Sequence, residues 1–331
     1  MRADVLTRLR CPICRKPVTR AAGGPVRCPA GHSFDVARQG YVNLLTGRAP
    51  HVGDTVEMVA AREDFLAAGH YDPILAALAD AARTAAPADA VAPADAVAPA
   101  DAVAPADAVA PADAVAPADA VGSGGRVGSE PSGVEPPLVV DAGAGTGRQV
   151  AAVLDALPGA VGLAVDVSKP ALRRAARCHP RAAAALADTW RPLPLADGSV
   201  TVLLNVFAPR NGPEFRRVLR PDGTLLVVTP AADHLAELVT ALDLLRVDPG
   251  KSDRVAGSLA GLFEPVATAE LRFRLTLTRA EVRTLVGMGP SAWHTDPARL
   301  AERTAALPEP VPVTGAVRLT AYRPVPARRT G

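Results

Sequence analysis

Beyond residue 137, the sequence alternates apolar strand-like segments with helix-like segments, and this alternation constrains the fold more than any other feature. PLVVDAGAGTGRQVAAVLDAL predicts a buried strand, a glycine turn and a helix, and GLAVDVSKPALRRAARCHP repeats the unit. Further buried strands are predicted in GSVTVLLNV and GTLLVVTP. LRFRLTLT and AVRLTAYRP alternate in polarity around the helix-like EVRTLVGM, which predicts two strands closing one edge. The sequence therefore predicts an α/β fold with a mostly parallel sheet.

The glycine turn VVDAGAGTGRQV indicates a ligand site at the end of the first of these strands. Gly143, Gly145 and Gly147 would let the backbone approach a ligand, and Asp166 closes the next strand, where it could bind a ribose. The turn alone is also compatible with a dinucleotide. Because Asp141 lies beside the turn and would repel a pyrophosphate, a cationic sulfonium cofactor is the better match.

Two further polar residues follow predicted strands. Asp188 comes after a third short strand, and Asn205 comes after the fourth. The carboxyl ends of parallel strands share one edge of the sheet, so both residues are expected to line one rim with Asp141 and Asp166.

The N-terminal segment contains a Cys-x-x-Cys pair followed by Cys-x-x-x-His, which gives Cys11, Cys14, Cys28 and His32. Two short-spaced pairs on turns can present four soft ligands at tetrahedral corners, as structural zinc requires. Four protein ligands leave no position for a water molecule, so the metal is expected to be structural, not catalytic. The remaining cysteine, Cys178, is interpreted as incidental.

The same segment is basic. Residues 1–48 contain nine Lys and Arg residues against Asp4 and Asp35, a formal charge of +7, although the whole chain carries only +2. This surface, with Phe34 and Tyr41 available for stacking, would suit a nucleic-acid backbone. The alternative is an arginine-rich face that is simply solvated.

From Pro87 to Val121 the hexad PADAVA repeats, and a Gly/Ser-rich stretch continues to about Pro137. Regularly spaced prolines and aspartates oppose helix, strand and core formation, so the segment is expected to be an extended, disordered spacer. No apolar run approaches a signal peptide or membrane span, so we expect a cytoplasmic protein that does not engage a membrane.

The arrangement of strand-end residues resembles the class I S-adenosylmethionine-dependent methyltransferases, which have a Rossmann-like fold. The resemblance implies that Asp166 binds the ribose hydroxyls and Asp188 the adenine. In that class, enzymes that methylate exocyclic or amide nitrogens carry an Asn/Asp-Pro-Pro-aromatic loop after strand four. This chain has NVFAPRN there, which disfavours adenine-N6 and glutamine methylation.

Several motifs resemble the 23S ribosomal RNA guanine-N1 methyltransferases more specifically, in particular the branch that includes macrolide (tylosin) resistance enzymes. The resemblance rests on CPIC and CPAGH, HSFDVARQGYVNLL, DTVEMVAAREDFLAAGHYDP, NVFAPRN, TPAADHLAEL and MGPSAWH. It implies zinc on the four Cys/His positions, cofactor contacts from Tyr71, Gly145, Thr146 and His234, and a homodimer whose cleft receives an RNA hairpin lining the peptide exit tunnel.

The sequence thus predicts a zinc-binding RNA-recognition module (1–48), a connecting helical segment that contributes to the cofactor site (49–86), the spacer (87–137) and a methyltransferase catalytic domain (138–331). S-adenosylmethionine and structural Zn²⁺ are the expected cofactors. The expected cofactor-binding residues are Tyr71, Asp141, Gly143, Gly145, Thr146, Gly147, Asp166, Asp188, Asn205 and His234.

No residue is assigned as the catalytic base. Asn205 and Arg210 are the candidates for a catalytic role, but an amide is a poor base and a guanidinium could only stabilise charge on guanine O6. Two alternatives stay open at this stage: a methyltransferase acting on a small natural product, and an RNA-binding regulator with a vestigial cofactor site.

Overall fold

The structure is a computed structural model that describes residues 1–21, 23–47, 53–86, 88–91, 135–245, 257–293 and 296–326. Most of the predicted spacer lies outside these residues. Within the predicted range, Ala88–Val91 form the short helix α4, and residues 135–137 lead into the first central strand. The division into four segments remains a prediction.

An eight-stranded sheet forms the centre of the molecule, with strand order β10-β11-β9-β8-β5-β6-β7-β4. Strands from β9 to β4 are parallel, whereas β11 runs antiparallel to both β9 and β10. The predicted mixed, mostly parallel sheet is therefore confirmed. The bounds are β4 (Val42–Asn43), β5 (Leu138–Ala142), β6 (Val161–Asp166), β7 (Ala182–Leu186), β8 (Val200–Val206), β9 (Leu219–Pro230), β10 (Phe263–Leu277) and β11 (Val311–Pro324).

Two hydrophobic cores cover the two faces of this sheet. Side chains alternate along a strand, so Val139 of β5 joins the core beneath the helices, while Leu138 and Val140 join the opposite core. In the first core α3 packs on α5. The helices are α2 (Val56–Ala67), α3 (Asp72–Ala85), α5 (Arg148–Ala156), α6 (Lys169–Ala175), α7 (Gly212–Val218), α8 (Ala236–Leu242), α10 (Arg279–Gly287) and α11 (Pro297–Ala305), with a 3-10 turn η1 (Pro290–Trp293).

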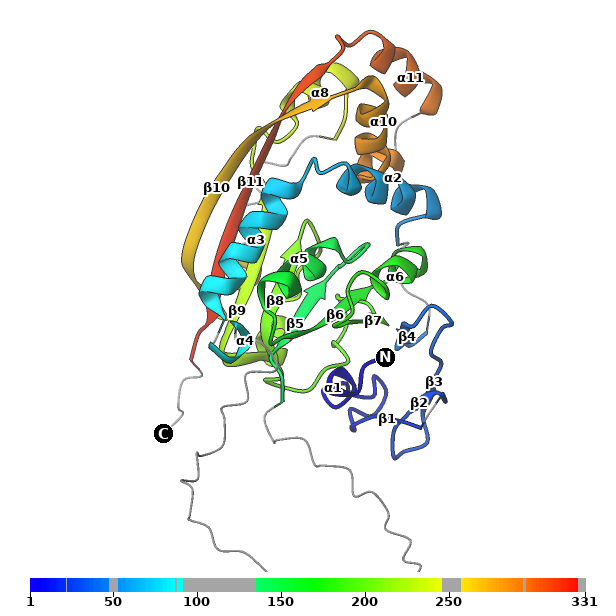
Figure 1. The fold of residues 1–331 in the computed structure, drawn as a ribbon, viewed down its shortest axis with the longest axis vertical. Helices are drawn as coiled ribbons and strands as arrows, with labels where there is room; N and C mark the ends of the chain where they lie inside the picture. The colour runs from blue at the N-terminus through cyan, green and yellow to red at the C-terminus, as the bar shows by residue number, and fades with distance from the viewer. Residues whose placement is uncertain are drawn as a thin grey trace, which may run out of the picture.

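The N-terminal module helps to cover the second face. It contains α1 (Ala3–Leu6) and a small antiparallel sheet of β1 (Thr19–Arg20), β2 (Val26–Arg27) and β3 (Ser33–Phe34). Its apolar side chains share a core with α7 and with β5. It also contributes β4, which pairs in parallel with β7 at the sheet edge (Figure 1). The N-terminal module is thus joined to the α/β part of the molecule through a common core and a common sheet.

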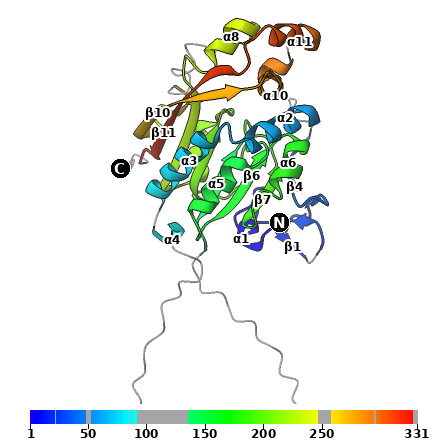
Figure 2. The ribbon, with the colours of Figure 1, turned by 45° about the horizontal axis from the view of Figure 1, so that its top comes forward.

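The C-terminal part forms the opposite edge. β10 and β11 form a long antiparallel pair that runs from Phe263 and Pro324 to Leu277 and Val311, and α10, η1 and α11 lie between the two strands in the chain. Helices α8, α10 and α11 gather at one end of the molecule, next to α2 (Figures 1 and 2). No helix among the described residues is long and apolar enough to cross a membrane.

Candidate cofactor site and metal centre

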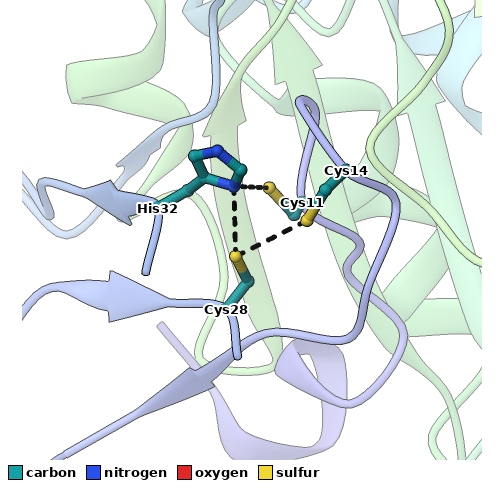
Figure 3. Close-up of side chains that lie close together, drawn as sticks. All are labelled: Cys11, Cys14, Cys28 and His32. Carbon is teal, nitrogen blue, oxygen red and sulfur yellow. Dashed lines mark hydrogen bonds between the residues drawn. The ribbon is translucent and has the colours of Figure 1, made fainter. Parts of the chain in front are cut away.

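The four predicted metal ligands converge on one point (Figure 3). Their ligand atoms all lie within 4.8 Å of one another. His32 Nδ1 is 3.5 Å from Cys11 Sγ and 3.3 Å from Cys28 Sγ, and the Sγ atoms of Cys14 and Cys28 are 3.6 Å apart. Ligands 2.0–2.3 Å from one zinc ion would stand roughly 3.3–3.8 Å apart at tetrahedral corners. The residues fit a structural zinc ion.

Two tight turns produce this convergence. In the first, Arg15 N–H donates to Cys11 O at 2.8 Å, and Arg15 adopts a positive φ of 61°. In the second, Gly31 N–H donates to Cys28 O at 3.0 Å, and Gly31 has a φ of 85°. The ligand geometry therefore follows from the local sequence of each pair.

Most of the positive charge predicted to face RNA is bonded within the protein. Arg8, for example, is only 6% exposed and donates to Glu135 and to Pro136 O. Arg15 donates to Leu193 O and Leu195 O, which fixes the first metal turn to the segment between β7 and β8. The arginines of this module that donate to backbone carbonyls are Arg2, Arg8, Arg10, Arg15 and Arg20. These hydrogen bonds restrict the directions in which the guanidinium groups can meet a partner.

The two aromatic rings predicted to stack on a nucleic acid are not available. Phe34 and Tyr41 are only 8% and 7% exposed and belong to the hydrophobic core, so this expectation is wrong.

At the glycine turn after β5, Gly143, Gly145 and Gly147 all have positive φ values, of 88°, 54° and 84°. A Cβ on Gly143 would lie 2.4 Å from the Cβ of Ala208, and a Cβ on Gly147 would lie 2.8 Å from Cys178 Sγ. The protein itself fills the space beside these two glycines. Gly143 and Gly147 therefore admit close packing of neighbouring segments, and their predicted contact with a cofactor remains a prediction.

Gly145 and Asp166 are linked directly. Asp166 Oδ2 accepts the Gly145 N–H at 2.8 Å, and Oδ1 accepts the Ser168 N–H at 2.7 Å. Burial raises the pKa of Asp166, although these two hydrogen bonds oppose the increase. Each oxygen keeps a further lone pair, so the carboxylate can hold the turn and still accept a ligand hydroxyl.

Asp141 lies at the end of β5 and is 1% exposed. Neither carboxylate oxygen has a hydrogen-bond partner among the described residues. Burial, reinforced by the charge of Asp166, raises the pKa of Asp141 to about 8, although the nearby Val150 backbone N–H, which does not form a well-aligned hydrogen bond, opposes the increase. A buried carboxyl without a partner is costly, so this group indicates a missing cation or donor.

Other polar atoms at this rim are similarly unsatisfied. Asp188 Oδ1 accepts the Trp190 N–H at 2.9 Å, while Oδ2 has no hydrogen bond and lies 3.6 Å from Arg191 Nε. Asn205 donates from Nδ2 to Ala142 O at 3.2 Å, but its Oδ1 has no partner within the described part of the chain. Thr146 Oγ1 is also buried and unpartnered there. The rim therefore offers several polar groups to one ligand.

Tyr71 and His234, which only the family resemblance singled out, lie together. Tyr71 Oη is 3.4 Å from His234 Nε2, and Ala316 N–H donates to His234 Nδ1 at 3.1 Å. Phe207 stacks on His234, with ring centroids 5.9 Å apart and an interplanar angle of 29°. Phe65 and Phe273 also contact Tyr71, so the two predicted residues are part of a larger aromatic cluster.

The sequence analysis did not single out two contributors to this region, Arg62 and Phe207. Arg62 on α2 pairs with Asp54, and its Nη1 lies 3.2 Å from where a Gly145 Cβ would stand. Phe207 is the central residue of the NVFAP motif, and the sequence alone does not indicate that its ring contacts His234. By contrast, no hydrogen bond or ion pair between described residues joins Arg210 to the acidic rim. Burial lowers the pKa of Arg210, and the charge of Tyr322 opposes this.

Comparison with known proteins agrees with both parts of the site. Residues 9–48 match a zinc-ribbon family described as "RlmA, N-terminal", and residues 140–227 match a family described as "Methyltransferase domain". A Micromonospora griseorubida protein named as a 23S rRNA (guanine-N(1)-)-methyltransferase is 64% identical over 328 residues, covering 98% of this chain and 100% of that protein. The "23S rRNA (guanine(748)-N(1))-methyltransferase" of Streptomyces fradiae is 47% identical over 326 residues, with coverage of 98% and 100%. These full-length similarities confirm the resemblance: the chain belongs to the 23S rRNA (guanine-N1)-methyltransferase family.

Proposed function

We propose that the protein transfers a methyl group from S-adenosylmethionine to N1 of guanine 748 in 23S rRNA, in a hairpin that lines the peptide exit tunnel. The position follows the name of the Streptomyces fradiae relative, which is 47% identical over nearly the whole chain. The observation that carries the chemistry is the buried, unpartnered Asp141 beside the glycine turn. The reaction would take place in the cytoplasm and protect the ribosome against macrolides.

The rim residues fit this cofactor. Asp141 would face the positively charged methionine portion, Asp166 would accept the ribose hydroxyls, and Asp188 would accept from the adenine. Tyr71 and His234 would close the site from the aromatic cluster. The bound cofactor supplies an activated methyl group on a sulfonium, so much of the rate enhancement would come from positioning the acceptor in line with it.

Guanine N1 lies on the Watson–Crick edge of the base and carries a proton at neutral pH. The base must therefore leave its pair or lie in a loop, and the proton must be lost on methylation. Asn205 would act as a positioning residue, because its Nδ2 donates to Ala142 O and to Pro209 O and thereby fixes the loop after β8. The residue that accepts the proton is unassigned.

The zinc module would contribute to RNA binding through basic side chains that are not hydrogen-bonded within the protein. Lys16 and Arg27 are exposed on its surface. A homodimer would place two such modules along one hairpin and double the positive surface that the RNA meets.

The decisive experiment incubates the purified protein with labelled S-adenosylmethionine and 23S rRNA that lacks this modification, followed by primer extension. Methylated N1 blocks base pairing, so a single stop at guanine 748 is the expected result. A stop at another guanine would refute the position but keep the reaction. Tight cofactor binding without labelled RNA would refute the RNA substrate and favour a small-molecule acceptor. Absence of cofactor binding would favour an RNA-binding regulator.

A further inference from the structure

Phe207 has a backbone conformation that its side chain disfavours. Its φ is 52°, in the left-handed region, where a bulky residue other than glycine is an outlier. Such conformations persist only where surrounding contacts impose them, and they concentrate at functional sites. Phe207 directly follows β8, one residue after Val206 and two after the rim residue Asn205.

Three contacts hold Phe207 in this conformation. Its N–H donates to Val228 O at 3.1 Å, which keeps the backbone attached to β9. Asn205 Nδ2 donates to Pro209 O at 2.8 Å and closes the loop on itself. Ala208 packs so closely on the glycine turn that only a glycine fits at position 143. The loop is therefore fixed between β9 and the predicted cofactor site.

The ring of Phe207 projects from a rigid base. It is 40% exposed, yet it stacks on the buried His234 and lies 6.3 Å from the Tyr71 ring. His234 is held in turn by the Ala316 N–H and by Tyr71 Oη. One side of the Phe207 ring is thus supported by ordered aromatic groups, and the ring still presents exposed surface at the rim.

We propose that the target guanine, extruded from its hairpin, stacks on the exposed surface of Phe207. This inference rests on the proposed function, because it requires an RNA base as the methyl acceptor. Stacking is available to any base through its π face, and a ring fixed next to Asn205 would align the base edge with the methyl donor. Trp190 is also exposed among the described aromatic residues, but it follows β7, two strands from β5, whereas β8 adjoins β5 directly.

The test compares Phe207→Leu with Phe207→Tyr in full-length protein. Leucine keeps an apolar side chain but removes the π face, so kcat/KM for unmodified 23S rRNA is expected to fall roughly five- to hundred-fold. Tyrosine should restore most of the activity. S-adenosylhomocysteine affinity, measured by calorimetry, and the melting temperature should stay near wild type in both variants. Val266→Ala, which changes an exposed side chain on β10, serves as the control and should leave kcat/KM unchanged.

A second readout separates stacking from a structural role. The readout is the fluorescence of 2-aminopurine placed at the target position of the hairpin. Stacking lowers this fluorescence, so it should be lower in the complex with wild type than in the complex with Phe207→Leu. Equal kcat/KM for Phe207→Leu and wild type would overturn the inference, as would a loss explained by weaker S-adenosylhomocysteine binding. If wild type itself does not methylate the RNA, the proposed function fails, which is distinct from failure of Phe207 alone.

Discussion

The zinc module (residues 1–48) and the acidic rim (Asp141, Asp166, Asp188 and Asn205) differ in how their polar groups are hydrogen-bonded. In the module, arginines that look available in the sequence donate to backbone carbonyls and hold the module on the sheet. At the rim, both carboxylate oxygens of Asp141 and the amide oxygen of Asn205 are buried without a hydrogen-bond partner in the described part of the chain. Satisfied polar groups indicate a structural role, whereas buried unsatisfied ones indicate a ligand that the chain alone does not supply.

Removal of the metal should have the largest effect. The module shares a core with β5 and α7, so loss of zinc is expected to destabilise the whole catalytic domain. We expect Cys28→Ser, or treatment with a strong chelator, to lower the free energy of unfolding by at least ~3 kcal/mol. Thermal denaturation followed by circular dichroism measures this. Cys178→Ser, at a cysteine outside the metal centre, should destabilise the protein much less, and equal losses would contradict a structural zinc ion.

Asp141→Asn should lower the affinity for the cofactor. It should also remove a pH-dependent loss of stability from the ligand-free protein. The folded-state pKa of about 8 lies above the ordinary value of 3.8, so between these pH values the folded protein binds more protons than the unfolded protein. Wild type must therefore lose stability from this group as pH rises from about 4 to 8. In the variant, this decrease should shrink by roughly 2–5 kcal/mol. Urea denaturation at several pH values measures it, and parallel pH profiles would be the contrary result.

Arg8→Met should reduce stability without reducing RNA affinity. The substitution removes the hydrogen bonds to Pro136 O and Asp4 O and the ion pair with Glu135. The expected loss is about 1–3 kcal/mol, because buried carbonyls lose a charged donor. RNA binding measured well below the melting temperature should stay within about twofold of wild type. A large loss of affinity with unchanged stability would show that Arg8 contacts RNA.

The double variant Lys16→Ala and Arg27→Ala should lower RNA affinity without reducing stability, which is the converse of the Arg8→Met result. Its effect on stability should be the smallest of those predicted. Both side chains are exposed, so stability is expected to change by less than ~0.5 kcal/mol. If both contact phosphates, the affinity for the hairpin should fall several-fold, and the logarithmic salt dependence should decrease by about one to two. Filter binding across a salt series measures both quantities, and an unchanged slope would remove these residues from the RNA surface.

Local and periodic features could be predicted from the sequence. The mostly parallel sheet follows from repeated strand-turn-helix units, and the metal centre follows from two short-spaced ligand pairs, each on one turn. The carboxyl-end positions of Asp141 and Asp166 follow from the parallel arrangement of β5 and β6. In each of these cases a few neighbouring residues determine the outcome.

Features assembled from distant segments could not be predicted in this way. Tyr71, Phe207, His234 and Phe273 come from four separate elements, and their contacts depend on tertiary packing. Cys178 was interpreted as incidental, yet it packs against Gly147, and burial raises the pKa of its thiol to about 11. The sequence also does not show which arginines of residues 1–48 will donate to a backbone carbonyl, so net charge alone does not locate the exposed basic groups.

The central claim is that the buried carboxyl of Asp141 marks the site of a cationic cofactor. Calorimetric titration of S-adenosylmethionine at pH 7, in buffers of different ionisation enthalpy, tests it by counting protons. With a pKa of about 8, Asp141 is mostly protonated in the free protein and should ionise when the cation binds. We predict that wild type releases close to one proton more per bound ligand than Asp141→Asn does. Equal proton release and equal affinity in the two proteins would contradict the claim.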